Sequence, residues 1–196
     1  MERFRDRMYP IGRSLVFGIS LLLPVFFGAV EIPAQPMDEY RVKAAFVLNF
    51  VRFTQWPDES FAGADAPCRL CVAGDRTLES AFRALEGKKV GARLLHVRFV
   101  RKADDCEGCN AVFVGRDIDR SSLPNIFMAV KDRPVLTIGE TEEFIRRGGM
   151  IRFFVQEGRL RFEIDPKKVW QQHIKLSSRL LNLAVLSGDR YTGGMQ

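Results

Sequence analysis

The clearest indication of the fold of this 196-residue chain is the segment Leu70-Cys71-Val72-Ala73-Gly74-Asp75. Four apolar residues followed by glycine and a charged residue are typical of a buried strand that ends in a tight turn. The same pattern returns at Ala111–Val114, closed by Gly115-Arg116, and at residues 134–138, closed by Gly139-Glu140. Repeated short strands of this kind, with helical segments between them, favour an α/β fold with a largely parallel sheet.

Helical period or cap residues mark the segments around these strands, at residues 39–53, 77–85, 122–130 and 141–147. The first segment, 39–53, is apolar nearly all round and ends before Trp56-Pro57. A helix of this composition is either central in the core or shared with another subunit.

The C-terminal part predicts a hairpin followed by a long helix. Residues 150–155 and Arg159–Ile164 alternate around Gln156-Glu157-Gly158. Asp165-Pro166 then opens a final helix whose apolar stripes run to Ala184. We expect one α/β domain at 39–186, with helices on both faces of a mixed, largely parallel sheet and an added antiparallel hairpin, and a frayed tail at 187–196.

The N-terminus indicates export. Four arginines precede an uncharged apolar run at 15–30, which as a helix is shorter than the ~30 Å core of a bilayer. This arrangement predicts a signal peptide at residues 1–34 and a periplasmic mature protein. The alternative is an uncleaved anchor or a buried helix.

Charge and motifs exclude several classes of function. The chain carries 30 Lys and Arg against 24 Asp and Glu, well mixed along the sequence, which does not indicate a nucleic-acid partner. Walker, GxGxxG, GxSxG and HExxH motifs are missing, and His96 and His173 are interpreted as structural. We therefore expect a non-enzymatic protein without a metal or cofactor.

The four cysteines form two CxxC pairs, Cys68 with Cys71 and Cys106 with Cys109. In an exported chain an even count favours structural disulfides, whereas the same spacing also suits a zinc site. A redox-active pair is the third interpretation, but Cys71 lies inside an apolar stretch. The spacing leaves the pairing open.

Two further groups of residues are candidates for binding. The charges that follow the strands, Asp75, Arg116 and Glu140, predict a small-ligand pocket at the carboxyl ends of the sheet, or else tight turns with charges facing water. Arg152 and Arg161 lie across the predicted hairpin and give positive charge to one sheet face, as a binding patch or a solvated face.

Aromatic residues are the candidates for contact with a protein partner. They are Phe46, Phe50, Trp56 and Trp170. Large amphipathic aromatics dominate interface hot spots, and the same residue types also fill cores.

Several segments, taken in order, resemble the YfiR family of exported bacterial regulators. The matching segments are Tyr40-Arg41-Val42-Lys43-Ala44-Ala45-Phe46-Val47-Leu48-Asn49-Phe50-Val51-Arg52-Phe53-Thr54-Gln55-Trp56-Pro57, Leu70-Cys71-Val72-Ala73-Gly74-Asp75, Arg133-Pro134-Val135-Leu136-Thr137-Ile138-Gly139, Gly148-Gly149-Met150-Ile151-Arg152-Phe153, Arg161-Phe162-Glu163-Ile164-Asp165 and Leu176-Ser177-Ser178-Arg179-Leu180-Leu181-Asn182-Leu183-Ala184. Two positions depart from the family pattern: Asp165 stands where Asn is usual, and Trp170-Gln171-Gln172-His173 replaces a small, Gly-containing segment.

The resemblance implies a periplasmic α/β regulator, often dimeric, that restrains an inner-membrane diguanylate cyclase and is relieved by an outer-membrane lipoprotein. It also implies a Cys71–Cys109 bridge, with Cys68 and Cys106 as additional cysteines. Our leading hypothesis is such a regulator, which lowers cyclic-di-GMP synthesis by binding the inactive cyclase better. The alternatives are an exported disulfide- or zinc-stabilised small-ligand-binding domain and a thiol–disulfide oxidoreductase.

Overall fold

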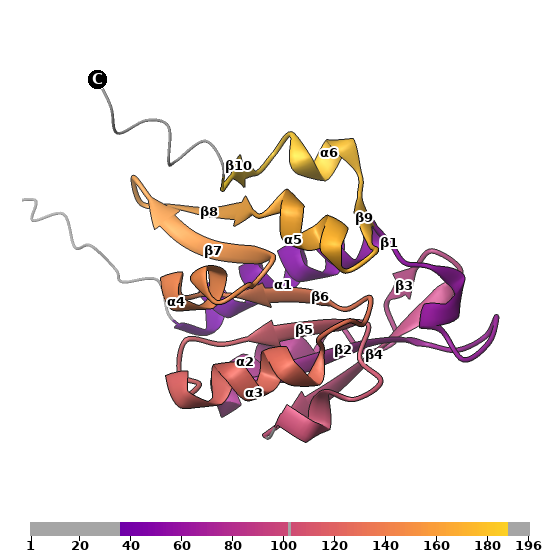
Figure 1. Cartoon of the computed structure of the whole chain (residues 1–196). Helices are drawn as coiled ribbons and strands as arrows, with labels where there is room; N and C mark the ends of the chain where they lie inside the picture. Colours follow the sequence, from indigo (N-terminus) through magenta and orange to yellow (C-terminus); the bar gives the residue numbers. More distant parts are fainter. Residues whose placement is uncertain (1–35, 102, 188–196) are drawn as a thin grey trace, which may run out of the picture. The chain divides into compact units, whose positions relative to one another are not determined.

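An eight-stranded sheet organises the computed structural model of this chain, which describes residues 36–101 and 103–187 (Figure 1). Across the sheet the strands are β10 (Val185–Leu186), β8 (Arg159–Ile164), β7 (Ile151–Gln156), β6 (Leu136–Gly139), β5 (Ala111–Val114), β2 (Cys68–Ala73), β4 (Arg93–Val100) and β3 (Lys89–Val90). The strands from β7 to β4 are parallel, and β8 and β3 run antiparallel to their neighbours β7 and β4. The predicted α/β class with a largely parallel sheet is confirmed.

Helices cover both faces of this sheet (Figure 1). α1 (Pro36–Arg52) and α2 (Arg76–Arg83) lie on one face, and α3 (Leu123–Ala129) and α4 (Glu142–Arg146) lie on the other. The chain moves from β2 to β4 in one direction across the sheet and from β5 to β6 in the opposite direction. Because crossovers between parallel strands are right-handed, this reversal sends α2 and α3 to opposite faces.

Two cores follow from the alternation of side chains along the strands. Leu70 and Val72 of β2 belong to the core beneath α1 and α2. Cys71 and Ala73 belong to the core beneath α3 and α4. β5 is buried on both faces along its whole length and β2 is buried on both faces from Leu70 to Ala73, which explains the apolar run in each strand.

The broad apolar surface of α1 is largely used within the chain. Val47 and Val51 are fully buried in the core beneath the helix, and α1 also packs against α2. The outward stripe contains Arg41, Asn49 and the half-exposed Val42. Most of the apolar pattern therefore needs no second subunit.

The prediction of one long final helix is wrong. The segment is divided into α5 (Pro166–Gln171), β9 (Lys175–Leu176), α6 (Ser178–Leu181) and β10. His173 has a positive φ of 56°, which no helix accommodates, and the hydroxyl of Ser177 caps α6 by accepting from the Leu180 N–H. β9 pairs with β1 (Thr54–Gln55) just after α1, so tertiary pairing overrides the helical stripes.

The hairpin prediction is confirmed by β7 and β8, which a two-residue turn joins. Glu157 and Gly158 both have positive φ, as this kind of turn requires. Short 3₁₀ segments, Asp58–Ser60, Ala103–Cys106 and Arg120–Ser122, complete the connections. The predicted signal peptide at 1–34 and nearly all of the predicted tail at 187–196 lie outside the described residues. Within the described part of the chain no helix is long and apolar enough to cross a membrane.

Candidate functional site

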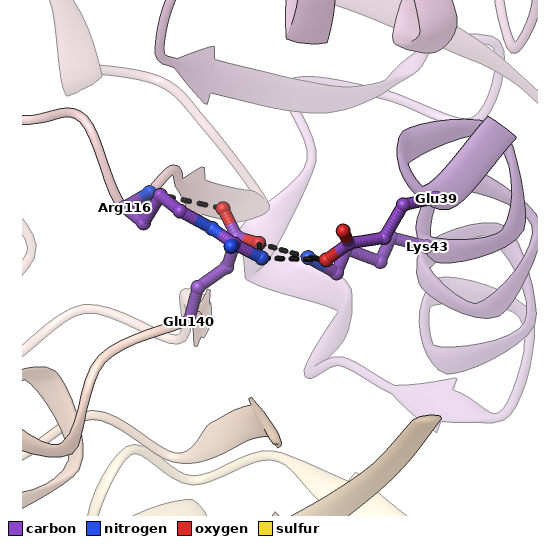
Figure 2. A network of polar contacts seen from close by, with 4 residues as sticks. All are labelled: Glu39, Lys43, Arg116 and Glu140. Atoms are coloured by element: carbon purple, nitrogen blue, oxygen red, sulfur yellow. Dashed lines mark hydrogen bonds and ion pairs between the residues drawn. The ribbon is translucent and has the colours of Figure 1, made fainter. Parts of the chain in front are cut away.

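A network of four charged side chains, two of them buried, joins α1 to the carboxyl ends of the sheet (Figure 2). Lys43, only 1% exposed, contacts the carboxylates of both Glu39 and Glu140 through its Nζ. Arg116 lies 2.5 Å from Glu39 Oε1 and 3.4 Å from Glu140 Oε1, measured from Nη2. Positive and negative groups alternate through the network, so each charge has an opposite neighbour.

Local structure places each member of this network. Glu39 and Lys43 are one helical turn apart on α1 and therefore lie on the same face. Arg116 follows β5 and Glu140 follows β6; in the parallel pair, Val114 lies opposite Gly139. The backbone N–H of Arg116 also donates to Glu140 Oε2 at 2.9 Å. Adjacent parallel strands thus bring the two turns together.

The network shifts the pKa values of Glu39, Arg116 and the neighbouring Tyr40. Burial alone would raise the pKa of Glu39, but its contacts with Lys43 and Arg116 outweigh this and lower the pKa. Burial works against the charged form of Arg116 too, and the carboxylates of Glu140 and Glu39 nevertheless raise its pKa. Burial and the charge of Glu140 raise the pKa of Tyr40 to about 12. Glu39 and Arg116 are therefore both charged near neutral pH.

Beside the network is a hollow of about 280 Å³. Its other wall is apolar and comes from the β7–β8 hairpin, through Phe153, Phe154, Val155 and Leu160. Val155 and Leu160 lie opposite each other in the hairpin. This hollow combines a charged wall with an apolar wall at the surface between α1 and the hairpin.

A larger hollow of about 660 Å³ opens at the carboxyl ends of β2 and β4, next to α3. Ala73, Val100 and Ile126 give it apolar walls, and Asp117 and Arg101 add charges. Burial raises the pKa of Asp117, and the nearby carboxylates of Asp75 and Glu140 add to this shift. The hollow lies where the strand order reverses, between β2 and β5, which is where open α/β sheets bind ligands.

The charges that follow the strands have specific structural roles. Asp75 caps α2 by accepting from the Leu78 N–H at 2.9 Å, and Arg116 and Glu140 belong to the network. Glu140 has a side chain only 1% exposed, so the expectation that these charges face water fails for it. At Gly139 an added Cβ would lie 2.5 Å from Cγ of Phe144. This glycine is therefore required by packing.

A disulfide joins Cys71 in β2 to Cys109, just before β5, with 5.9 Å between their Cα atoms. Cys68 and Cys106 carry free thiols, and both are buried. The expectation that these two cysteines also form a disulfide is therefore wrong. The reason is geometric. Cys68 lies three residues before Cys71 on β2, so its side chain points to the opposite face of the sheet, into the core beneath α1. Cys106 lies in the core beneath α3, on the same face as Cys71.

The thiols of the remaining cysteines are held in their neutral form. Burial raises the pKa of Cys68 to about 12, and burial also raises the pKa of Cys106. A raised thiol pKa lowers the thiolate fraction, and the thiolate is both the nucleophile and the zinc ligand. This geometry gives no support to the redox or zinc interpretation.

The four predicted partner-binding aromatics do not form one surface. Phe50 is 1% exposed and stacks on Phe153 in the core, so it has no surface to offer a partner. Phe46 is partly buried on α1, and Trp56 donates from Nε1 to the Asn110 carbonyl at 3.1 Å. Trp170 is 79% exposed on α5.

Other predicted residues are placed as follows. His96 is exposed and lies 3.1 Å from Glu86 Oε1, measured from Nδ1. Arg152 contacts the buried Glu163 carboxylate, whereas Arg161 is exposed. The sequence interpretation missed Lys43, although a lysine in a nearly continuous apolar segment with Glu39 four residues before it was a usable signal.

The fold and these sites define an α/β domain with a closed charged network, and comparison with known proteins gives its family. A family described as YfiR/HmsC-like matches residues 40–185, so this chain belongs to that family. Members are generally periplasmic, non-enzymatic regulators that interact with a membrane signalling protein.

Solved structures give weaker similarities. One is an ABC domain in complex with L-Trp from Streptococcus pneumonia, at 8% identity and a TM-score of 0.43, covering 60% of this chain and 54% of that one. Another is a conserved domain protein from Vibrio cholerae O1 biovar El Tor, at 10% identity and a TM-score of 0.48, covering 75% of this chain and 59% of that one. This chain thus spans little more than half the length of either. No curated protein matches it.

Proposed function

We propose that this chain is a periplasmic regulator that binds the periplasmic part of an inner-membrane diguanylate cyclase and lowers cyclic-di-GMP synthesis. The observation that carries the proposal is the family match over residues 40–185. Regulation works by population shift, because a protein that binds the inactive cyclase more tightly than the active one favours the inactive state by that difference in affinity. Release by an outer-membrane lipoprotein belongs to the same proposal.

The test uses purified components. The mature chain is mixed with the periplasmic segment of a diguanylate cyclase from the same genome, and the complex is measured by light scattering and by titration calorimetry. A saturable complex is expected, together with reduced activity of the detergent-solubilised full-length cyclase. Failure of every such cyclase to bind would contradict the proposal. The same light scattering gives the mass of the chain alone and so tests the predicted homodimer.

Three of the aromatic residues remain candidates for partner contact. Phe46 and Trp56 are partly exposed, and Trp170 on α5 is the most exposed of the three. Trp170→Ala and Phe46→Ala are each expected to weaken the complex if their rings are buried by the cyclase. Unchanged affinity in a well-folded variant removes that residue from the interface.

A small-ligand-binding domain is the second candidate, favoured by the hollow of about 660 Å³ where the strand order reverses. We test it by measuring the melting temperature of the chain against a panel of small periplasmic metabolites. A stabilising compound should lose its effect in Ala129→Phe, which fills the hollow from α3. Equal stabilisation of both proteins would place the compound elsewhere.

A further inference from the structure

Most of the outer side of β8 has no paired strand in the described part of the chain. β10 pairs only with Glu163 and Ile164 of β8. Within residues 36–101 and 103–187, no strand pairs with residues 159–162 on that side. Unpaired backbone at a sheet edge is a template for another strand.

The register shows which backbone groups face this opening. The Ile164 carbonyl accepts from the Ser187 N–H at 3.0 Å, so Ile164 directs its backbone groups toward β10. Asp165 donates to the Met150 carbonyl at 2.8 Å, in the opposite direction. Because this direction alternates along a strand, Leu160 and Phe162 direct their N–H and C=O groups into the opening.

The first half of the opposite edge strand, β4, is covered by the chain itself. There the Leu95 N–H donates to the Lys88 carbonyl, and the Val97 N–H donates to a Glu86 carboxylate oxygen at 2.7 Å. Segment 86–88 thus covers the first half of β4. The first half of β4 thus has its outward backbone groups paired, whereas residues 159–162 of β8 have no paired strand on their outer side within the described residues.

Side chains along the opening specify what would fit. Arg159 and Arg161 are exposed on one face of the sheet. Leu160 points to the other face, where it packs beside the exposed Val155 and lines the hollow next to the charged network. A strand added here therefore meets positive charge on one face and apolar surface on the other.

Charge opposes the pairing of two copies through this edge. An antiparallel self-pairing centred on Arg161 or on Leu160 places arginine directly opposite arginine, and like charges opposite one another destabilise a pair. A centre at Phe162 would place Arg161 opposite Glu163, but β10 already pairs with Glu163. The edge therefore favours a different chain with acidic side chains.

We propose that residues 159–162 of β8 bind an extended segment of a partner protein by strand addition, and that this segment alternates carboxylates with apolar side chains. Its carboxylates lie beside Arg159 and Arg161, and its apolar residues lie beside Leu160 and Phe162. Main-chain hydrogen bonds supply affinity and the alternation supplies specificity. This names a contact surface for the regulator proposed above and in that sense rests on the proposed function.

A six-residue peptide that alternates glutamate with valine, acetylated and amidated, tests the proposal with the mature chain. Saturable shifts of the Leu160 and Phe162 amide resonances are expected in NMR titrations. N-methylation of the peptide at the amides that face β8 should abolish the shifts, while N-methylation at the other amides should leave them. Absence of saturable shifts at these two amides up to millimolar peptide would overturn the proposal.

The matched variant reverses the charge of the edge. With Arg159→Glu and Arg161→Glu together, the glutamate peptide should bind about tenfold more weakly, and a lysine–valine peptide should gain affinity, because two cross-strand charge pairs change sign. Leu160→Pro removes an outward N–H and should abolish binding of either peptide. Equal affinity of the charge-reversed variant for both peptides would overturn the charge argument.

Two results would show that something other than a partner protein covers residues 159–162, and either would overturn the proposal. A chain ending at Ser187 that binds the peptide more than tenfold tighter would show that residues 188–196 occupy the edge. A dimer that Leu160→Pro dissociates would show a second copy there. The peptide titration needs no cyclase, so a negative result leaves the regulator proposal standing. If a cyclase binds the charge-reversed variant as well as the unmodified chain, only the strand-addition proposal is contradicted.

Discussion

The charged network at the ends of β5 and β6 and the arginines along β8 use the same residue types in opposite ways. Lys43 and Glu140 are almost completely buried and satisfied by one another, with Glu39 and Arg116 around them. Arg159 and Arg161 are exposed beside an unpaired strand edge. The charges of the network are thus paired across elements and hold the fold together, whereas the exposed arginines lie where backbone pairing stops.

The largest effect is expected from removing one partner of the buried network. Lys43→Met leaves the buried Glu140 carboxylate with only the half-exposed Arg116, 3.4 Å away, as its cation. It should lower the free energy of unfolding by about 3 kcal/mol, the lower end of the range for a broken buried ion pair. Urea denaturation measures this loss. Glu140→Gln combined with Lys43→Met should recover part of it, because the uncompensated charge is then gone.

Arg146→Gln is the matched control for that experiment. Its partner Glu143 lies on the surface of α4, so the free energy of unfolding should stay close to that of the unmodified chain. If Lys43→Met were as mild as this control, the network would not be holding α1 to the sheet.

The second largest effect is expected from removing the disulfide. Replacing Cys71 and Cys109 together by alanine should lower the free energy of unfolding by about 2–4 kcal/mol, because the bridge closes a loop of 38 residues. The stability of the Cys68→Ala variant, whose altered side chain is on the opposite face of β2, should still fall when reductant is added. If reductant no longer lowered the stability of Cys68→Ala, the cysteines would be paired differently.

Acid should weaken the network in a defined direction. The pKa of Glu39 is lowered in the folded chain from an ordinary value of 4.5, so its ionised form contributes stability above that pH. The contribution is lost as the pH falls through the folded pKa. The difference in unfolding free energy between the unmodified chain and Glu39→Gln should therefore shrink from pH 7 to pH 3. A difference that grows would reverse the sign of the pKa shift.

The smallest effect on stability is expected at the open edge. Arg159→Glu and Arg161→Glu should each change the free energy of unfolding by no more than about 0.5 kcal/mol, because their side chains are exposed. Thermal and urea denaturation check this. A destabilisation comparable to that of Lys43→Met would mean that the edge arginines hold the fold, and the contrast between the two regions would disappear.

Local pattern made most of the fold predictable. The bounds of β5 and β8 were predicted to the residue, because each strand was closed at both ends by turn residues. Thr141 was also predicted as a helix cap, and its hydroxyl accepts from the Phe144 N–H. The last helix failed because its stripes gave no sign of the pairing between β9 and β1.

The candidate site was less predictable because it depends on strand order. Glu39 and Lys43 are neighbours on one helix and visible in the sequence, but Arg116 and Glu140 join them only through the parallel register of β5 and β6. Phe50 was misplaced at a surface because an apolar helix does not reveal which residues face the sheet. The open edge required knowing that β10 covers only two residues of β8.

The most direct test of the regulator proposal is cellular cyclic-di-GMP, measured with the gene present, deleted and restored. Deletion should raise cyclic-di-GMP. The unmodified chain should reverse this rise, and the Arg159→Glu, Arg161→Glu chain should reverse it poorly at equal periplasmic abundance. Unchanged cyclic-di-GMP after deletion, under conditions in which the protein is present in the periplasm, would contradict the regulator proposal.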